Sequence, residues 1–360
     1  MKILIVKLGS IGDIVHTLPS LAAIRRAMPR AEISWAVERG SAEILRDNPF
    51  VDRLIEVDTK ALRRWPMSGE TLLAPRQQLR RLRASSFDAA LDFQGLLKSA
   101  AIARLSRARR LYGYSREALR EPASRLLLTR TVSTSADLHV IVKGLRLTAG
   151  ALGIAVPAEP SEFEFPIGTT RAHDLEAEGV LPPAGARYAI LNPGGGWPTK
   201  LWGAERFGAL SDELWIHHGL HSIVTYGPGE RELAEAVVKR ASRTNKARAV
   251  SLSLKGFYAL ARRADIYVGG DTGPTHLAVA AGAPVVGLFG PTEWWRNGSP
   301  RPEDICVERN DIGCRIDCNR RSCSQWVCMD IEVEPVLGAV SERLRRAVSL
   351  TARVETRGVA

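Results

Sequence analysis

A carboxylate directly after the first apolar segment is the first candidate for chemistry in this 360-residue chain. Asp13 ends the loop Gly9-Ser10-Ile11-Gly12-Asp13, which follows the apolar run Lys2–Val6. A carboxylate at this place could act as a general base, and His16 is a rival base. The alternative interpretation is an aspartate that caps the next helix. Spacing alone leaves both interpretations of Asp13 open.

Glycine-rich loops form a second candidate site in the other half of the chain. They follow Asn192, Tyr226 and Gly269, each at the end of an apolar segment. Glycine lets the backbone approach a ligand, and a following helix offers free N–H groups to phosphate. No loop has the Walker A pattern and none fits G-x-G-x-x-G, so a nicotinamide dinucleotide is not favoured. Together the three loops predict a site for an anionic or nucleotide ligand.

Polar residues in these loops sharpen the prediction. Lys200 follows Gly194-Gly195-Gly196 and is placed to meet a phosphate, although it could also be an ordinary surface lysine. The run Asp271-Thr272-Gly273-Pro274-Thr275-His276 combines a candidate helix cap with small residues and a histidine, which could instead be a packed core residue. Glu230 could accept hydrogen bonds from ribose hydroxyls or simply favour a helix N-terminus.

The sequence predicts alternating strands and helices, and these elements must position the loops. The predicted α/β fold has two doubly wound parallel sheets, in a first domain at 1–160 and a second at 171–335, with a C-terminal helix and tail at 336–360. The proline-rich segment 156–170 is the predicted connection. Carboxyl ends of both sheets are expected to face a central cleft. Predicted strands are Lys2–Val6, Ile33–Val37, Leu54–Val57, Phe87–Phe93, Tyr188–Asn192, Ser222–Tyr226, Ile266–Gly269 and Pro284–Phe289. Predicted helices are 14–27, 69–84, 96–105, 136–152, 204–216 and 333–350, with two more beginning near Glu230 and Thr275.

The charge of the chain is concentrated in its first part. The whole chain carries +11, from 50 Lys+Arg and 39 Asp+Glu. Residues 1–150 hold 26 Lys+Arg and 14 Asp+Glu, a net charge of +12, whereas residues 151–360 hold 24 and 25, a net charge of −1. This asymmetry predicts an anionic partner for the first domain: nucleic acid, a membrane surface, or a phosphorylated or carboxylated substrate. With no signal-peptide core and no apolar stretch long enough to span a bilayer, the sequence predicts a soluble, cytoplasmic protein.

Five cysteines lie between Cys306 and Cys328, with the spacing Cys306-x7-Cys314-x3-Cys318-x4-Cys323-x4-Cys328. No C-x2-C pair is present, so a cluster of reduced structural thiols is favoured over a zinc or iron–sulfur site. No metal site and no required cofactor are predicted. The sequence leaves open a divalent cation such as Mg²⁺ and the oligomeric state.

Several motifs together resemble the ADP-heptose:lipopolysaccharide heptosyltransferases, glycosyltransferase family 9. The resemblance extends from Met1 to about residue 340. Two motifs carry it: Lys7-x2-Ser10-x-Gly12-Asp13-x2-His16-x-Leu18-Pro19 and Asp271-Thr272-Gly273-Pro274-x-His276. Three more are most similar to heptosyltransferase I: Arg63-Arg64-Trp65, Gln94-Gly95-Leu96-Leu97-Lys98-Ser99-Ala100 and Ser115-Arg116-Glu117-x3-Arg120-Glu121-Pro122.

The resemblance implies a GT-B fold with an N-terminal acceptor domain and a C-terminal nucleotide-sugar domain. It implies inverting transfer of L-glycero-D-manno-heptose from ADP-heptose to the Kdo sugar of Kdo-lipid A. The protein would then work peripherally on the cytoplasmic face of the inner membrane, an anionic surface. Asp13 matches the general base, Lys200 the diphosphate lysine, Glu230 the ribose-binding glutamate, and Leu252 an adenine-packing residue. The other donor-site candidates are Gly195, Gly196, Asp271, Thr272, Gly273 and His276; the acceptor-site candidates are Lys7, Ser10, Gly12, Arg63, Arg64, Gln94, Lys98, Arg116 and Arg120.

Two departures from heptosyltransferase I leave alternatives open. Gly195 and Gly196 stand where that type often has a threonine pair, and the cysteine-rich segment is absent from the simplest members. A heptosyltransferase II-type enzyme, or another GT-B enzyme with a different acceptor or nucleotide-sugar, is therefore an alternative. A non-enzymatic protein that binds nucleotides or nucleic acid through the basic face is a further one, although the chain has no nucleic-acid-recognition motif and nucleic acid is not a predicted partner.

Overall fold

The computed structural model describes residues 1–59, 79–314, 318 and 320–357. These residues form two compact units, Met1–Gly168 (unit 1) and Thr169–Ala360 (unit 2). Arg63 and Arg64, two predicted acceptor residues, lie outside the described residues.

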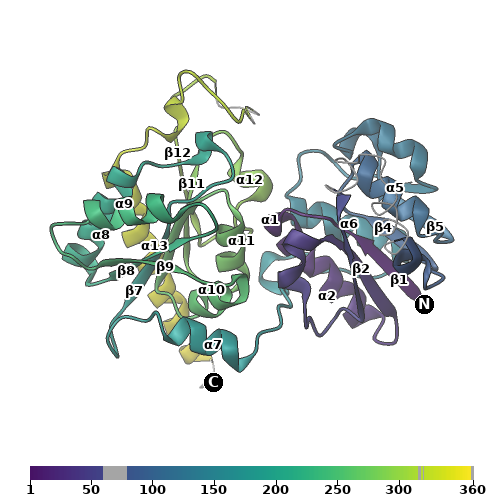
Figure 1. Ribbon diagram of the computed structural model, residues 1–360, viewed down its shortest axis with the longest axis horizontal. Helices are drawn as coiled ribbons and strands as arrows, with labels where there is room; N and C mark the ends of the chain where they lie inside the picture. The colour runs from purple at the N-terminus through teal and green to yellow at the C-terminus, as the bar shows by residue number, and fades with distance from the viewer. Residues whose placement is uncertain (60–78, 315–317, 319, 358–360) are drawn as a thin grey trace, which may run out of the picture. The chain divides into compact units, whose positions relative to one another are not determined.

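The described strands of unit 1 form a six-stranded parallel sheet in the order β3-β2-β1-β4-β5-β6 (Figure 1). This is the strand order of a dinucleotide-binding Rossmann sheet, in which the chain reverses its direction of travel between β1 and β4. The strands are β1 (Lys2–Val6), β2 (Glu32–Glu38), β3 (Arg53–Val57), β4 (Ala89–Asp92), β5 (Arg110–Tyr114) and β6 (Arg130–Val132).

Helices cover both faces of this sheet. One core contains Leu4, Val6 and Ala90 of the sheet with Ile102 and Ala103 of α5 (Leu97–Leu105). On the other face, α2 (Leu18–Ala27) packs against α6 (Val140–Leu152). Between β1 and α2 lies the short helix α1 (Ile11–Val15). The predicted single helix over 14–27 is therefore wrong: the chain breaks at His16 and Thr17, and α2 begins with Pro19 in its first turn, where a missing N–H costs nothing.

Unit 2 repeats the same sheet. Its described strands lie in the order β12-β11-β10-β7-β8-β9, all parallel, so the reversal falls between β7 and β10. The strands are β7 (Tyr188–Asn192), β8 (His221–Tyr226), β9 (Ala247–Ser251), β10 (Ile266–Gly270), β11 (Val285–Phe289) and β12 (Ile305–Glu308).

Two layers of helices enclose the second sheet. On one face α8 (Ala204–His218), α9 (Arg231–Arg240) and α13 (Val333–Arg357) share a core with the strands, in which Trp202 is fully buried. On the other face α10 (Leu254–Ala261) lies over Tyr188 and Tyr267, the hydroxyl of Tyr188 donating to the Leu260 carbonyl at 2.8 Å. Beside α10 are α7 (Arg171–Glu178) and α11 (Gly273–Ala280), and α12 (Trp294–Asn297) follows β11.

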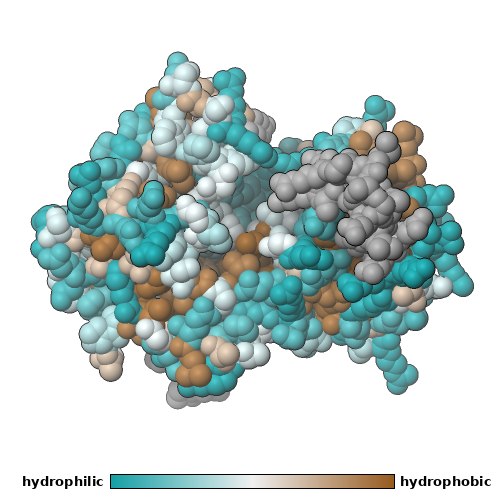
Figure 2. All heavy atoms as spheres, in the orientation of Figure 1, coloured by the Kyte–Doolittle hydropathy of each residue, from teal (hydrophilic) through white to brown (hydrophobic). Residues whose placement is uncertain are grey.

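The predicted α/β doubly wound architecture is confirmed for both units. All eight predicted strands are present, with bounds shifted by two residues at most. The strands β5, β6, β9 and β12 were not predicted. No helix within the described part of the chain combines the length and the apolar character needed to cross a bilayer. Hydrophilic residues cover most of the face shown in Figure 2, and hydrophobic residues form small separate patches.

The sheet topology explains why the candidate residues gather. Ligands of open parallel sheets bind beyond the carboxyl ends of the strands, at the point where the strand order reverses. In unit 1 the loops at that point follow β1 and β4, and they carry Asp13 and Gln94. In unit 2 they follow β7 and β10, and they carry Lys200 and Asp271.

Candidate functional site

Asp13 lies in the first turn of α1, just after β1. Its Oδ2 accepts a hydrogen bond from the Ser10 N–H at 2.9 Å, so the carboxylate caps its own helix. About a third of the side chain is exposed (32%), which leaves it accessible to a substrate hydroxyl. The two sequence interpretations, cap and base, are thus compatible in one side chain. Gly12 is buried in the same turn.

Lys7 holds the other oxygen of this carboxylate. The buried Lys7 Nζ lies 3.1 Å from Asp13 Oδ1 and donates to the Phe93 carbonyl at 3.0 Å. Trp35 fixes the lysine backbone by donating its indole N–H to the Lys7 carbonyl at 3.0 Å. Lys7 therefore contacts the candidate base directly.

Gln94 joins the same group from the loop after β4. Its Nε2 lies 3.5 Å from Asp13 Oδ2, and its Oε1 accepts the Leu8 N–H at 3.1 Å. The Gln94 N–H donates to Asp92 Oδ1 at 2.9 Å, and Ser99 Oγ donates to Asp92 Oδ2 at 3.0 Å. Asp92 is fully buried, and burial raises its pKa to about 6 against these hydrogen bonds. Asp92 supports the loop that carries Gln94.

Opposing influences set the protonation of Asp13. Burial would raise its pKa, but the Lys7 ammonium, through charge and hydrogen bond, the Ser10 N–H and the Arg120 charge together lower it. The carboxylate is therefore ionised at neutral pH and ready to accept a proton.

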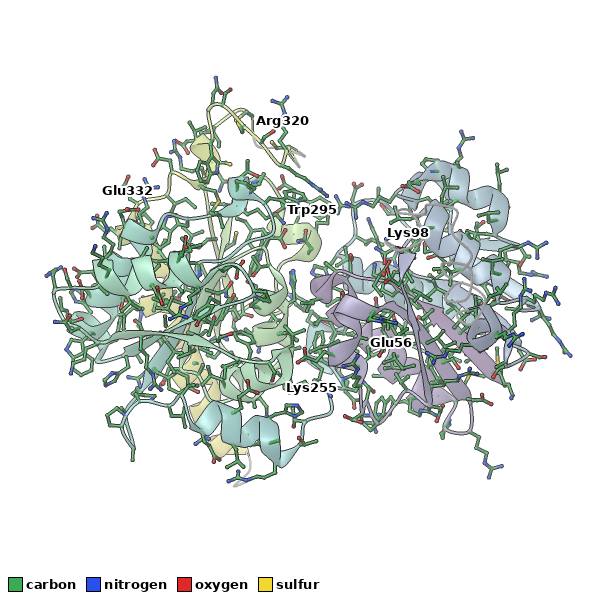
Figure 3. The ribbon with its side chains drawn as sticks, in the orientation of Figure 1. Glu56, Lys98, Lys255, Trp295, Arg320 and Glu332 are labelled. Atoms are coloured by element: carbon green, nitrogen blue, oxygen red, sulfur yellow. The ribbon has the colours of Figure 1, made fainter. Side chains whose placement is uncertain are left out.

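The remaining acceptor candidates differ in how they relate to Asp13. Arg120 acts on Asp13 electrostatically. Arg116 is exposed on the turn η3 (Arg116–Ala118), and no contact places it beside Asp13. Lys98 projects from α5 (Figure 3), with its Nζ 3.9 Å from Glu38 Oε1.

Lys200 is the centre of the candidate site in unit 2. It ends the turn η6 (Pro198–Lys200) in the loop after β7. Its Nζ donates to Asp271 Oδ2 at 2.5 Å and to the Asp271 carbonyl at 3.1 Å. The same ammonium lies 4.3 Å from the centre of the Trp197 ring, a cation–π contact.

Asp271, after β10, collects three side chains. Besides Lys200, its Oδ1 lies 3.2 Å from His276 Nε2 and accepts from Asn297 Nδ2 at 2.7 Å. Burial would raise the pKa of this carboxyl, but the hydrogen bonds and charges of His276 and Lys200 lower it well below its ordinary range. Asp271 thus fixes Lys200 and His276 at the N-terminal end of α11.

Glu230 connects two of the glycine loops. Its Oε1 accepts the Gly195 N–H at 3.1 Å and its Oε2 accepts the Gly227 N–H at 2.9 Å. A Cβ on Gly194 would collide with this carboxylate, so residue 194 must be glycine for Glu230 to sit here. Each carboxylate oxygen keeps a lone pair for a further donor.

The other donor candidates lie on the same loops. Thr272 precedes α11 and donates to Asn192 Oδ1 at 3.4 Å, and Gly273 is the first residue of that helix. Gly196 is exposed in the loop that leads to Lys200. Leu252 is half-buried between β9 and α10, with no contact that joins it to Lys200 or Asp271.

Sequence reasoning missed residues that support these groups. Asn297, 26 residues beyond Asp271, belongs to no motif. The only sequence feature that could have indicated it is a polar residue in the region after β11. Trp197 and Asp92 are the others, one stacked on Lys200 and one beneath Gln94. Across the described part of the chain, no three His, Cys, Asp or Glu side chains form a group that could hold a metal ion.

Comparison with known proteins places this geometry in a family. A sequence model of glycosyltransferase family 9 (heptosyltransferase) matches residues 76–326. The chain belongs to glycosyltransferase family 9. Within this family, it is 33% identical to lipopolysaccharide heptosyltransferase 1 of Pseudomonas aeruginosa over 328 residues, which cover 90% of this chain and 88% of that protein. It is 30% identical to lipopolysaccharide heptosyltransferase 1 of Escherichia coli K12, over 81% of this chain and 89% of that protein.

A solved structure shares the fold of this family-9 chain. The E. coli heptosyltransferase WaaC with ADP-2-deoxy-2-fluoro heptose superposes with a TM-score of 0.74 at 26% identity, covering 94% of this chain and 99% of that one. The fold is GT-B, as predicted, and the resemblance to heptosyltransferase I is confirmed.

Proposed function

We propose that this protein is an inverting glycosyltransferase that moves L-glycero-D-manno-heptose from ADP-heptose to Kdo of the lipopolysaccharide inner core, as heptosyltransferase I does. The observation that carries the proposal is 33% identity to a heptosyltransferase 1 over nine-tenths of the chain. The charged groups at the strand-order reversals of both sheets support it, because they supply a base and an anion site.

Asp13 is the proposed general base. As the acceptor hydroxyl oxygen attacks the anomeric carbon of the heptose, Asp13 takes the hydroxyl proton, the bond from the anomeric carbon to the diphosphate oxygen breaks, and ADP leaves. Attack from the side opposite the diphosphate inverts the anomeric carbon. Lys7 acts through Asp13 by holding Oδ1, and Ser10 and Gln94 hold Oδ2.

Lys200 is the proposed partner of the diphosphate. Its ammonium has three N–H donors, of which two point at Asp271. The third donor, together with the free N–H groups at the start of α11 beside Thr272 and Gly273, would stabilise negative charge as it develops on the leaving ADP. Gly195, Gly196 and His276 complete the proposed donor loops. We assign the ribose hydroxyls to Glu230 and the adenine ring to Leu252.

The acceptor is proposed to bind unit 1. Kdo carboxylates and lipid A phosphates are anionic, and residues 1–150 carry a net charge of +12. Arginine suits such groups because its guanidinium pairs bidentately with carboxylate and phosphate. Among the residues that the structure describes, the acceptor candidates are Lys98, Arg116 and Arg120. The sequence motifs add Arg63 and Arg64.

A lipid-linked acceptor places the protein at a membrane surface, and we propose peripheral binding on the cytoplasmic face of the inner membrane. The turn η4 (Pro122–Leu127) packs against α5 and presents Leu126, which is 87% exposed. Leu97 and Leu105 on α5 are also exposed, and the basic Arg104 lies between them in sequence. Apolar and basic side chains together suit an anionic bilayer surface.

An assay of donor and acceptor choice tests the proposal. Purified protein is given ADP-heptose with Kdo-lipid A, with a heptosylated acceptor, or with neither, and ADP release is measured. Release that requires Kdo-lipid A supports type I transfer. Release only with the heptosylated acceptor would replace it by the type II alternative, and turnover of a UDP- or GDP-sugar in place of ADP-heptose would contradict the donor assignment.

A further inference from the structure

Four of the five cysteines line a single small cavity in unit 2, which we name the cysteine pocket. The fifth, Cys306, lies on β12 and is not part of its lining. All five carry reduced thiols. The residues that line the pocket are Thr199, Pro291, Cys314, Cys318, Arg320, Cys323, Trp326, Val327 and Cys328.

Cys323 and Cys328 differ in exposure and in the direction in which their pKa is shifted. Cys323 is exposed, and its Sγ accepts the Trp326 N–H at 3.3 Å. Hydrogen bonds from the Trp326 and Gln325 N–H groups, and the Arg320 charge, lower the pKa of this thiol. Cys328 is buried, and burial together with the neighbouring Cys318, Cys314 and Cys323 raises its pKa. An exposed thiol of lowered pKa beside further thiols is typical of redox-responsive sites.

The pocket is hydrogen-bonded to the loop that carries Lys200. The Trp326 indole N–H donates to the Thr199 carbonyl at 2.9 Å, and Thr199 Oγ1 donates to the Arg320 carbonyl at 2.7 Å. Arg321 lies 5.2 Å from the centre of the Trp197 ring, the ring on which Lys200 also stacks. Figure 3 labels Arg320 on the segment between β12 and the turn η7 (Val327–Met329). A displacement of Trp326 or Arg320 would therefore reach Thr199, the neighbour of Lys200, through these two direct hydrogen bonds.

We propose that the cysteine pocket is a thiol–disulfide site whose oxidation weakens donor binding. The Cys323 thiolate attacks one sulfur of a small-molecule disulfide and expels one thiolate. A second pocket thiol then loses its proton and attacks Cys323 Sγ, expelling the other thiolate. Two protein thiols are oxidised to one disulfide, and the small disulfide is reduced to two thiols.

The new bond turns Cys323 away from the Trp326 N–H and displaces Trp326 from Thr199. The loop at Thr199 then holds Lys200 less firmly, and ADP binds more weakly. This last step rests on the proposed role of Lys200 at the diphosphate. A thiolate metal centre is the competing use of these cysteines, but within the described residues they do not form a metal-binding group.

The experiment treats the full-length reduced protein with glutathione disulfide. Cleavage after arginine separates Cys314, Cys318 and the pair Cys323 with Cys328 into three peptides. Mass spectrometry is expected to find an intramolecular disulfide that contains Cys323. ADP titration of the oxidised protein is expected to give an affinity roughly tenfold lower, about the effect of one lost hydrogen bond, with recovery after reduction by dithiothreitol.

Two variants sharpen the test. Cys323→Ser is expected to bind ADP normally and to lose the response to oxidation, whereas Cys306→Ser, outside the pocket, is expected to keep it. The proposal is overturned if no intramolecular disulfide forms, if the disulfide leaves ADP affinity unchanged, or if one zinc ion binds tightly and protects all four pocket thiols from glutathione disulfide. Failure of the reduced protein to bind ADP would instead refute the donor site, and the peptide masses would still report on the disulfide.

Discussion

At the scale of single residues, the candidate base and the candidate phosphate-binding lysine are each held by a second charge. Lys7 holds Asp13, and Asp271 holds Lys200. Both carboxylates have a lowered pKa, because their charged and hydrogen-bonding partners outweigh the cost of removing water: Lys7, the Ser10 N–H and Arg120 for Asp13, and His276 and Lys200 for Asp271. The pairing orients Asp13, the proposed base, and Lys200, the proposed phosphate-binding residue, before either substrate binds. This reduces the entropic cost of ordering these side chains during the reaction.

The pH dependence of turnover tests the pairing of Lys7 with Asp13. A base of lowered pKa loses activity only at pH values below the ordinary range of aspartate. Lys7→Met removes the cation and leaves burial dominant, so the pKa of Asp13 rises and the acidic limb of kcat/KM is expected to move up by about 1 to 3 pH units. Lys2→Met is the control, because Lys2 pairs with Glu32 on the surface. An unmoved limb in Lys7→Met would contradict the pairing.

The Lys200 assignment has a test by calorimetric titration. Lys200→Ala removes a charged hydrogen-bond donor to the diphosphate, and ADP affinity is expected to fall roughly tenfold to a hundredfold. Lys246→Ala provides a matched control, because Lys246 also stacks on a tryptophan, Trp215. Lys246 directly precedes β9, at the amino ends of the strands, whereas Lys200 lies beyond the carboxyl end of β7. Equal ADP affinity of the two variants would remove Lys200 from the donor site.

At the scale of elements, the strand-to-helix loops do the positioning. The loop after β7 approaches Glu230 so closely that a side chain at position 194 would occupy the space of the carboxylate. The same carboxylate bonds the loops after β7 and β8 together. The spacing of these two loops in unit 2 therefore depends on one glycine and one glutamate.

A pair of glycine variants isolates this effect. Gly194→Ala is expected to displace Glu230 and weaken ADP binding by about tenfold, the effect of losing one or two hydrogen bonds. Gly196→Ala keeps the backbone N–H, and its new Cβ would meet no atom within 4 Å, so near-normal ADP affinity is expected. Isothermal titration calorimetry measures the ADP affinity of both variants. Indistinguishable affinities would mean that the Glu230 contact does not shape the site.

The loops were predictable from the sequence because their strands are short, buried and apolar, with glycine directly after them. Three of the four missed strands lack that signal: β6 has three residues, and β9 and β12 lie at the edges of the second sheet, where few of their residues are fully buried. The fourth, β5, is buried but begins with Arg110 and contains Gly113, which interrupt its apolar pattern. Asn297 was missed for a different reason. Its contact with Asp271 arises only because β10 and β11 are neighbours in the sheet, which no local pattern encodes.

At the scale of the whole molecule, the two units carry different charges and use the same sheet topology. The basic excess lies in residues 1–150, and the exposed Leu126 lies in the same unit. An exposed apolar side chain combined with positive charge is expected to bind an anionic bilayer reversibly. Salt should weaken this binding, because ions screen the charge contribution.

Vesicle sedimentation tests the membrane face. Wild-type protein is expected to pellet with phosphatidylglycerol vesicles at low salt and to be released at high salt, while pure phosphatidylcholine vesicles bind little. Leu126→Ser should reduce the bound fraction. Leu175→Ser changes an exposed leucine of unit 2 and serves as the control. Equal loss of binding in both variants, or none in either, would contradict a membrane face at Leu126.

The role of Asp13 as the general base underlies the whole proposed reaction, and a comparison of the wild type with Asp13→Ala tests it. ADP release from ADP-heptose is measured with Kdo-lipid A for the wild type and for Asp13→Ala, alongside the ADP affinity of each. In Asp13→Ala we expect acceptor-dependent release to fall by at least about a hundredfold, the usual contribution of a general base, while ADP affinity is unchanged. Release at the wild-type rate in Asp13→Ala would contradict it.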